Sequence, residues 1–179
     1  MKASKRILLI PALSLFFLLA ASFGMYRLLK GESLLPEKIT RHAGVMYFEG
    51  EKKALVNQPL VINVMIDTNN QNVNAAGFYL KFDSEKISVT NVNTLSSFCQ
   101  YYPEKKFDNR LGIVSLACGS PHPGFKGKNQ LIQLTLTPLS IGTTVLRVTP
   151  ESKILLSDGK GTNILTEFPS WEVQIGAGL

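Results

Sequence analysis

Beyond residue 44 the sequence alternates apolar and polar side chains with a period of two, almost to the C-terminus. Successive residues of a β-strand point to opposite faces, so this alternation predicts strands with one buried and one exposed face. It is clearest at residues 60–66, where Leu, Ile, Val and Ile occupy every second position, and at residues 76–82. No apolar stripe of helical spacing covers ten or more residues after residue 31. The pattern therefore predicts an all-β domain.

Turn residues divide this part of the chain into about nine strands, or ten if the shortest segments are counted. The expected strands are 45–48, 60–66, 73–82, 87–92, 112–118, 130–139, 144–148, 154–156, 162–165 and 171–175. Many short strands at such a spacing are typical of two sheets packed face to face, so we expect a β-sandwich or jelly roll. We expect Trp171 on the inner face of the last strand.

An uncharged apolar run from Ile7 to Tyr26 precedes the domain. A helix of that length would span a hydrocarbon core of about 30 Å. Two interpretations are open: a retained transmembrane anchor, which we favour because the run continues to Arg27, or a cleaved signal peptide with small residues at 20–24. We expect a signal-anchor segment at 1–30, a linker at 31–43 and the sandwich domain at 44–179.

The distribution of charge indicates orientation and excludes one class of partner. Three basic residues precede the apolar run and two follow it, which places the N-terminus in the cytoplasm and the domain outside the cell membrane, or secreted if the run is cleaved. Five of the 19 basic residues flank this run, and all 13 acidic residues follow Gly31. Residues 31–179 therefore contain 14 basic and 13 acidic side chains. A nearly neutral domain without clustered basic residues argues against nucleic-acid binding.

The chain has two cysteines, Cys99 and Cys118. In an exported domain a disulfide between them is plausible and would close a loop of about 20 residues. Two small buried thiols are the alternative.

The segment VNAAGFYLKFDSEKISVTNV, residues 73–92, strongly resembles the cohesin module: a polar turn, an alternating strand that ends in Phe82-Asp83, a short turn and a β-branched strand. The resemblance extends from about residue 44 to 176, through GVMYFEGEKKALVNQPLVINVMIDT, QLIQLTLTPLSIGTTVLRV, SDGKGTNIL and SWEVQI. It implies a non-catalytic jelly roll, related in fold to carbohydrate-binding modules, whose family members bind dockerin modules.

The resemblance also indicates where a partner would bind. Cohesins that bind dockerins commonly carry polar contact residues six and eight positions before the Asp, and this chain has Gly77 and Ala75 there. Tyr79 and Lys81 share the same outer face and could contact a different partner.

Catalytic signatures are missing from the sequence. The two histidines are His42, in the linker, and His122, between two prolines in a loop. An oxygen-ligand loop at Asp158-Gly159 has a single acid, so a turn is the better interpretation. We therefore expect no enzyme activity, no cofactor and no metal site.

Three functions stay open. The first is protein-protein binding, with a dockerin-like partner or in cell-surface assembly, through the face that carries Tyr79 and Lys81. The second is direct polysaccharide binding through aromatic residues between Tyr101 and Phe107; since adjacent strand residues point to opposite sides, Tyr101 or Tyr102 must leave the core. The third is a passive surface domain.

Overall fold

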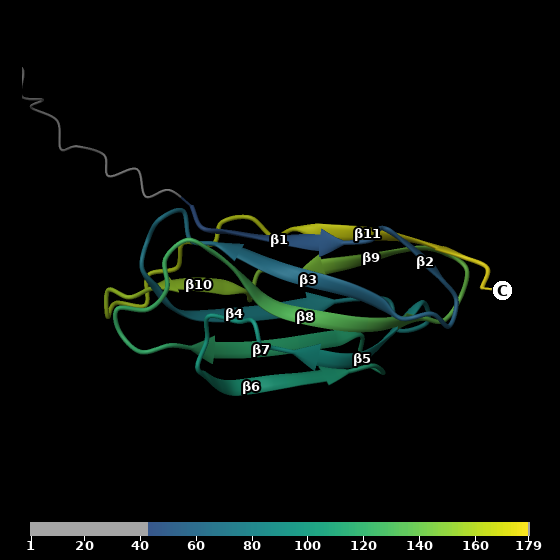
Figure 1. Ribbon diagram of the computed structural model, residues 1–179, viewed down its shortest axis with the longest axis horizontal. Helices are drawn as coiled ribbons and strands as arrows, with labels where there is room; N and C mark the ends of the chain where they lie inside the picture. The colour runs from purple at the N-terminus through teal and green to yellow at the C-terminus, as the bar shows by residue number, and fades with distance from the viewer. Residues whose placement is uncertain (1–42, 179) are drawn as a thin grey trace, which may run out of the picture. The chain divides into compact units, whose positions relative to one another are not determined.

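The computed structural model describes residues 43–178, and these form a two-sheet β-sandwich without a helix (Figure 1). Eleven strands follow one another along the chain: β1 (Val45–Gly50), β2 (Lys53–Leu55), β3 (Leu60–Asp67), β4 (Val73–Lys81), β5 (Ile87–Asn93), β6 (Tyr101–Asp108), β7 (Ile113–Gly119), β8 (Lys128–Pro138), β9 (Gly142–Val148), β10 (Lys153–Leu156) and β11 (Ser170–Gly176). The all-β prediction is confirmed. The expected membrane segment, and the expected linker apart from Ala43, lie outside the described residues.

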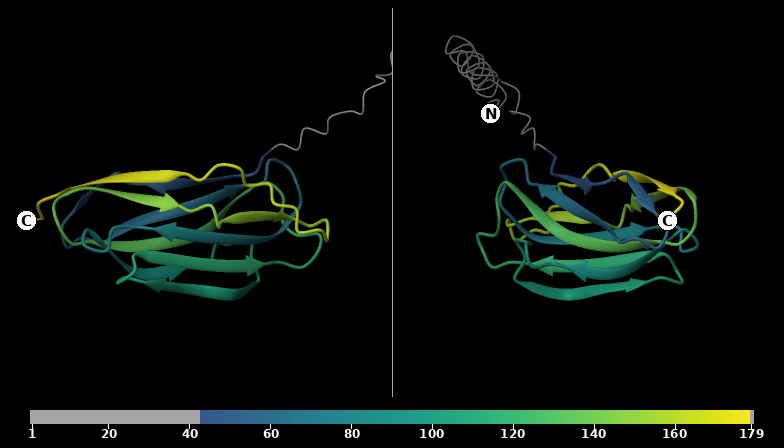
Figure 2. Two further views of the ribbon diagram at one scale, coloured as in Figure 1. Left: turned by 180° about the vertical axis from the view of Figure 1, so that it is seen from behind. Right: turned by 45° about the vertical axis from the view of Figure 1, so that its right-hand side comes forward.

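The strands form a four-stranded sheet in the order β1-β3-β8-β5 and a seven-stranded sheet in the order β2-β11-β9-β4-β7-β6, with β10 paired to β4. All pairs within the sheets are antiparallel except β11 with β2. The first view presents the four-stranded sheet, and the view from behind presents β4, β7 and β6 (Figures 1 and 2). The β6 strand lies at one edge of the large sheet.

The predicted alternation determines which side chains fill the space between the sheets. On β4, Ala76, Phe78 and Leu80 are buried, and the side chains between them face outward. On β3, Leu60, Ile62, Val64 and Ile66 are likewise buried. Trp171 lies on the inner side of β11, partly buried, with its ring centroid 5.9 Å from that of Phe48. These residues belong to one core within a compact unit that spans Arg41–Leu179.

Three expectations for individual segments are wrong, the first at Lys53–Leu55, which forms the unexpected short strand β2. Segment 162–165 is not a strand, because only isolated bridges form at Asn163 and Leu165. The Asn163 side chain accepts hydrogen bonds from the backbone N–H of Ile154 and of Leu165, and so takes the place of ladder partners. Segment 101–108, which we did not expect to be a strand, forms the edge strand β6.

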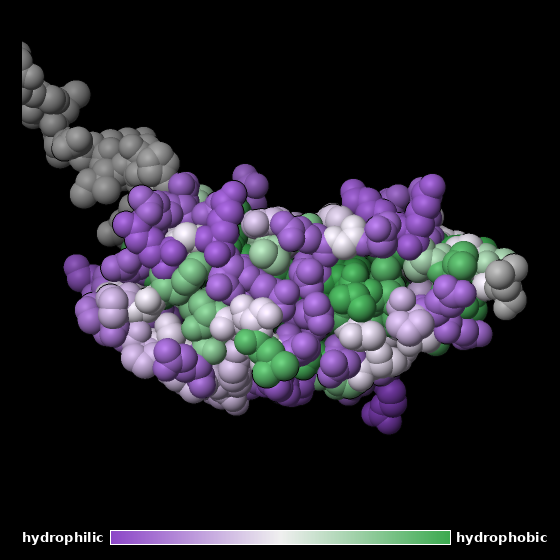
Figure 3. Space-filling model, in the orientation of Figure 1, coloured by the Kyte–Doolittle hydropathy of each residue, from purple (hydrophilic) through white to green (hydrophobic). Residues whose placement is uncertain are grey.

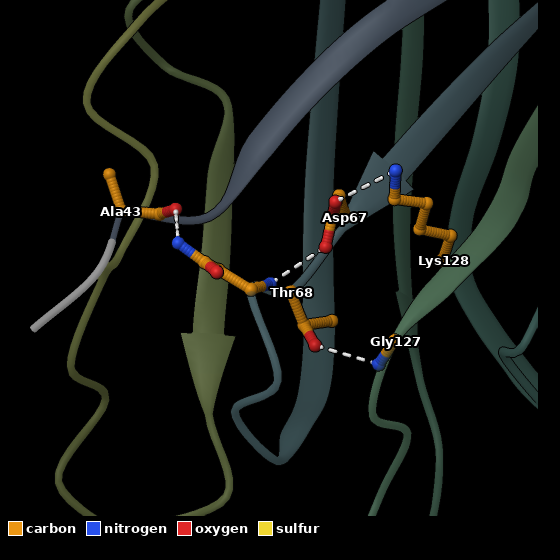
Figure 4. A network of polar contacts seen from close by, with 6 residues as sticks. Ala43, Asp67, Thr68, Gly127 and Lys128 are labelled. Carbon is orange, nitrogen blue, oxygen red and sulfur yellow. Dashed lines mark hydrogen bonds and ion pairs between the residues drawn. The ribbon is translucent and has the colours of Figure 1, made fainter.

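A polar network holds the turn after β3 and the start of the described chain (Figure 4). The Asp67 carboxylate accepts a hydrogen bond from the backbone N–H of Asn69 at 2.8 Å and pairs with Lys128 at 3.5 Å. The Asn69 amide donates to the carbonyl of Ala43, and Thr68 Oγ1 accepts from the N–H of Gly127 at 2.9 Å. Side-chain hydrogen bonds therefore fix the turn that follows β3.

Candidate functional site

The four residues singled out on β4 lie on the outer face of the large sheet. Ala75, Gly77 and Tyr79 are partly buried and Lys81 is exposed. We call this surface the β4–β7–β6 face; it also includes the outward residues of β10.

Small residues occupy the centre of this face. In the register of β4 with β7, Ala75 lies opposite Gly119 and Gly77 lies opposite Ala117. The next pair along the strands is Tyr79 with Ser115. The strand pairing therefore brings four side chains of minimal size together beside one large aromatic ring.

The structure separates the two adjacent tyrosines that we considered for sugar binding. Tyr101 is 52% exposed and lies on the β4–β7–β6 face. Tyr102 points to the other side, where its hydroxyl donates to the carbonyls of Thr94 at 3.2 Å and Cys99 at 3.1 Å. Only Tyr101 therefore joins the candidate residues of β4.

The Tyr101 ring rests on Gly119. A Cβ atom at Gly119 would lie 2.6 Å from Tyr101 Cζ and 2.5 Å from its hydroxyl oxygen, closer than real contacts allow. Gly119 therefore provides the space that the ring occupies.

A shallow pocket of about 310 Å³ is lined by Ala75, Gly77 and Ala117 and by both tyrosine rings. Its remaining lining comes from Pro103 on β6, from Leu155 and Lys153 on β10, and from Glu151 before that strand. A second depression of about 230 Å³ borders the other side of Tyr79 and includes Ile113, Ser115 and Lys81. Tyr79 thus forms a ridge between two hollows.

Polar contacts between β4 and β6 hold the Tyr79 ring in place. Its hydroxyl donates to Glu104 Oε2 at 3.2 Å, and Lys106 Nζ lies 2.8 Å from Glu104 Oε1. Burial raises the pKa of the Tyr79 phenol, and the Glu104 carboxylate raises it further. The hydrogen bond with Lys106 lowers the pKa of Glu104, so this carboxylate stays charged at neutral pH.

The backbone at Tyr79 has an unusual partner. Strand β10 pairs with the first half of β4 and β9 pairs with its end, which leaves Tyr79 in the gap between them. The buried Ser152 fills this gap: Tyr79 N–H donates to Ser152 Oγ at 2.9 Å, and that hydroxyl lies 3.3 Å from the Tyr79 carbonyl. The Tyr79 carbonyl also accepts from the N–H of Thr149 at 2.8 Å.

Cys99 and Cys118 are joined by a disulfide, as predicted, with their Cα atoms 5.8 Å apart. Both side chains are buried. The bond ties the segment before β6 to β7, and the N–H of Gln100 donates to the carbonyl of Gly119 at 2.8 Å. The disulfide therefore fixes the chain two residues before Tyr101.

The outer face of the four-stranded sheet is different in character. Its β3 and β8 strands present Asn63 and Gln133, which are hydrogen-bonded to each other at 3.0 Å, and β8 continues with two threonines. Hydrophilic residues predominate on the side shown in Figure 3, and separate apolar patches lie among them. The exposed Val61 belongs to this outer face.

Other sequence candidates lie away from the β4–β7–β6 face. His122 is exposed, and its Nδ1 lies 3.1 Å from Ser157 Oγ. Both carboxylate oxygens of Asp158 are used inside a turn, by the backbone N–H of Lys160 and by the Thr162 hydroxyl. Within residues 43–178 there is no group of three or more metal-ligating side chains and no helix able to cross a bilayer.

Sequence reasoning missed Gly119, Glu104, Ser152 and Leu155 as parts of this face. The alternation of Glu104 and Lys106 could have indicated a strand. Nothing local identifies Ser152, because its role depends on a backbone gap in a strand 73 residues away.

Comparison with known proteins supports the fold. No protein-family model and no curated protein matches the sequence. Among solved structures, a cohesin module of a family 33 glycoside hydrolase from Clostridium perfringens matches with a TM-score of 0.64 and 17% identity, over 76% of this chain and 99% of that module.

Two further neighbours were solved with partners. The sixth cohesin of scaffoldin B from Acetivibrio cellulolyticus, in complex with a dockerin, has a TM-score of 0.63 and 11% identity over 75% of this chain and 99% of its own. The third ScaB cohesin of R. flavefaciens, in complex with a group 1 dockerin, has a TM-score of 0.51 and 12% identity over 74% and 96%. The domain has a cohesin-like fold, which confirms the resemblance seen in the sequence.

Proposed function

We propose that this chain is a non-catalytic binding module that recognises a dockerin-like protein module through the β4–β7–β6 face. Solved neighbours of the same fold are complexes with dockerins, which supports a partner of this kind. The observation that carries the choice of face is the contrast between the two sheets. The large sheet presents hollows on either side of Tyr79, whereas the centre of the small sheet carries the hydrogen-bonded side chains of Asn63 and Gln133.

Hollows lined by aromatic residues are typical of protein-protein interfaces, in which tyrosine is enriched at the centre and charges lie at the rim. Tyr79 is held by Glu104 and Lys81 is exposed beside it, so a partner meets a fixed ring and an exposed cation. Cohesins that bind dockerins commonly use polar side chains at two positions of this strand. This chain must recognise its partner differently, because Gly77 and Ala75 offer no side-chain donor or acceptor.

The binding experiment uses the domain, residues 41–179, as bait for a panel of dockerin modules and for the secreted proteins of its own source. Gly77→Arg places a long charged side chain on the face, and a Cβ there would meet nothing nearer than Tyr79 Cε2 at 3.5 Å. Val61→Arg, on the other sheet, is the matched control. We expect capture by the native domain and by Val61→Arg, and none by Gly77→Arg. Equal capture by both variants would refute this face.

We also propose that the run from Ile7 to Tyr26 displays the domain outside the cell as a single-pass anchor. The disulfide supports export, because such bonds persist in oxidising compartments. External protease that leaves the domain intact on whole cells, but digests it after lysis, would contradict this orientation.

A further inference from the structure

The pocket between Tyr79 and Tyr101 has a floor that cannot pair with polar groups. Ala75, Gly77 and Ala117 form this floor and carry no side-chain donor or acceptor, and the pairing of β4 with β7 places their backbones inside a ladder. A polar side chain buried on this floor would lose its hydrogen bonds to water without replacement. An apolar side chain would lose nothing and would bury its surface.

The pocket also has the size and the walls for one large side chain. Its volume is about 310 Å³, and an engineered cavity of about 150 Å³ already accepts benzene. Tyr101 rests on Gly119 at one end, and Leu155 lies along β10. Tyr79 is held through Glu104 by Lys106, so this wall is ordered before the partner arrives. Binding therefore requires little further ordering of this wall.

The rim of the pocket carries two charged residues, Glu151 and Lys153. Of the two charged residues in the lining, Glu151 is hydrogen-bonded to the Thr149 side chain and interacts with Lys81. Lys153 forms no ion pair with any residue between 43 and 178. A carboxylate beside the inserted group would complement it.

We infer that the partner inserts one large aliphatic or aromatic side chain between Tyr79 and Tyr101 and places a carboxylate against Lys153. This inference rests on the proposed function and adds the chemistry of the contact: apolar insertion replaces the polar side-chain pair that Ala75 and Gly77 cannot provide.

The first test uses small probes and needs no partner. Amide chemical shifts of the isotope-labelled domain, residues 41–179, are followed during titration with N-acetyl-tryptophan, its neutral amide, and N-acetyl-glutamine amide. We expect both tryptophan probes to shift the amides of Gly77, Ala117 and Gly119, the carboxylate form to bind more tightly, and the glutamine probe to leave them unchanged. Lys153→Gln should remove the advantage of the carboxylate form.

Ala117→Leu fills the floor and should abolish these shifts, with Val61→Leu on the other sheet as control. Tyr101→Ala removes a wall and serves as the second variant if Ala117→Leu does not give a native spectrum. Absence of shifts at these three amides, or equal shifts with the glutamine probe, overturns the inference whether or not a partner is known.

The second test uses a dockerin module captured by the domain. Because a fully buried large apolar side chain contributes about 1.5–3 kcal/mol, Ala117→Leu should weaken its Kd about 10- to 150-fold. An unchanged Kd would overturn the pocket while leaving the proposed function intact. Conversely, capture that survives Gly77→Arg would refute the proposed face even if the tryptophan probes bind.

Discussion

Removing the disulfide between Cys99 and Cys118 should destabilise the domain by an amount that follows from the position of the bond. The two cysteines are 19 residues apart, and their side chains are only 7% and 4% exposed. In the reduced chain the unfolded state gains the freedom of this loop, whereas the folded state keeps its strand pairing between β6 and β7. The loss of stability therefore comes mainly from the greater conformational entropy of the reduced, unfolded chain.

The chain-entropy relation gives about 3 kcal/mol at 25 °C for a loop of this length. Cys99→Ala with Cys118→Ala should cost somewhat more than reduction alone, because it also removes two buried sulfur atoms from the core. Without the disulfide the unfolded chain is less compact and exposes more surface to solvent. The slope of the unfolding free energy against denaturant concentration should therefore increase as well.

Urea unfolding of residues 41–179 measures both quantities, with the single tryptophan, Trp171, as the fluorescent probe. The native domain is compared with and without reductant, and the double alanine variant, which reductant cannot affect, is the control. A loss below about 1 kcal/mol on reduction would refute the entropic argument. Labelling of both cysteines by a thiol reagent in the unreduced domain would refute the bond itself.

Two further predictions concern Tyr79. Ser152→Ala leaves the Tyr79 N–H without its partner and should lower the unfolding free energy by about 1–3 kcal/mol in the same urea assay. The control, Ser140→Ala at the surface, should lower it less. Equal losses in the two variants would contradict a bridging role for Ser152. Glu104→Gln should lower the pKa of Tyr79 while leaving it above the usual value, since burial, the larger cause, persists. Ring-carbon NMR titration measures this pKa; Glu172→Gln on β11 is the control, and an unchanged Tyr79 titration would refute the coupling.

The edge strand β6 shows why part of the fold could not be predicted. Its sequence, YYPEKKFD, lacks apolar alternation and contains a proline and two adjacent lysines. Such residues are typical of edge strands, where they prevent pairing with another chain. The alternation of apolar and polar residues therefore predicts β4 but not β6, although β6 supplies Tyr101 and Glu104 to the candidate site.

The same limit applies to the residues of the site. Alternation alone placed Ala75, Gly77, Tyr79 and Lys81 on one outer face, and the structure confirms that placement. It also required Tyr101 and Tyr102 to diverge, without saying which one would face outward. Whether any of these residues contributes to binding stays a prediction.

By itself the sequence determined the all-β class, most of the strands and the inner face of each, because side-chain direction along a strand is a local property with a period of two. Only the tertiary structure decided that Gly119 lies under the Tyr101 ring, that Glu104 reaches Tyr79 and that Ser152 fills the gap between β9 and β10. These contacts depend on strand order and register, which are set by backbone hydrogen bonds and core packing between distant segments.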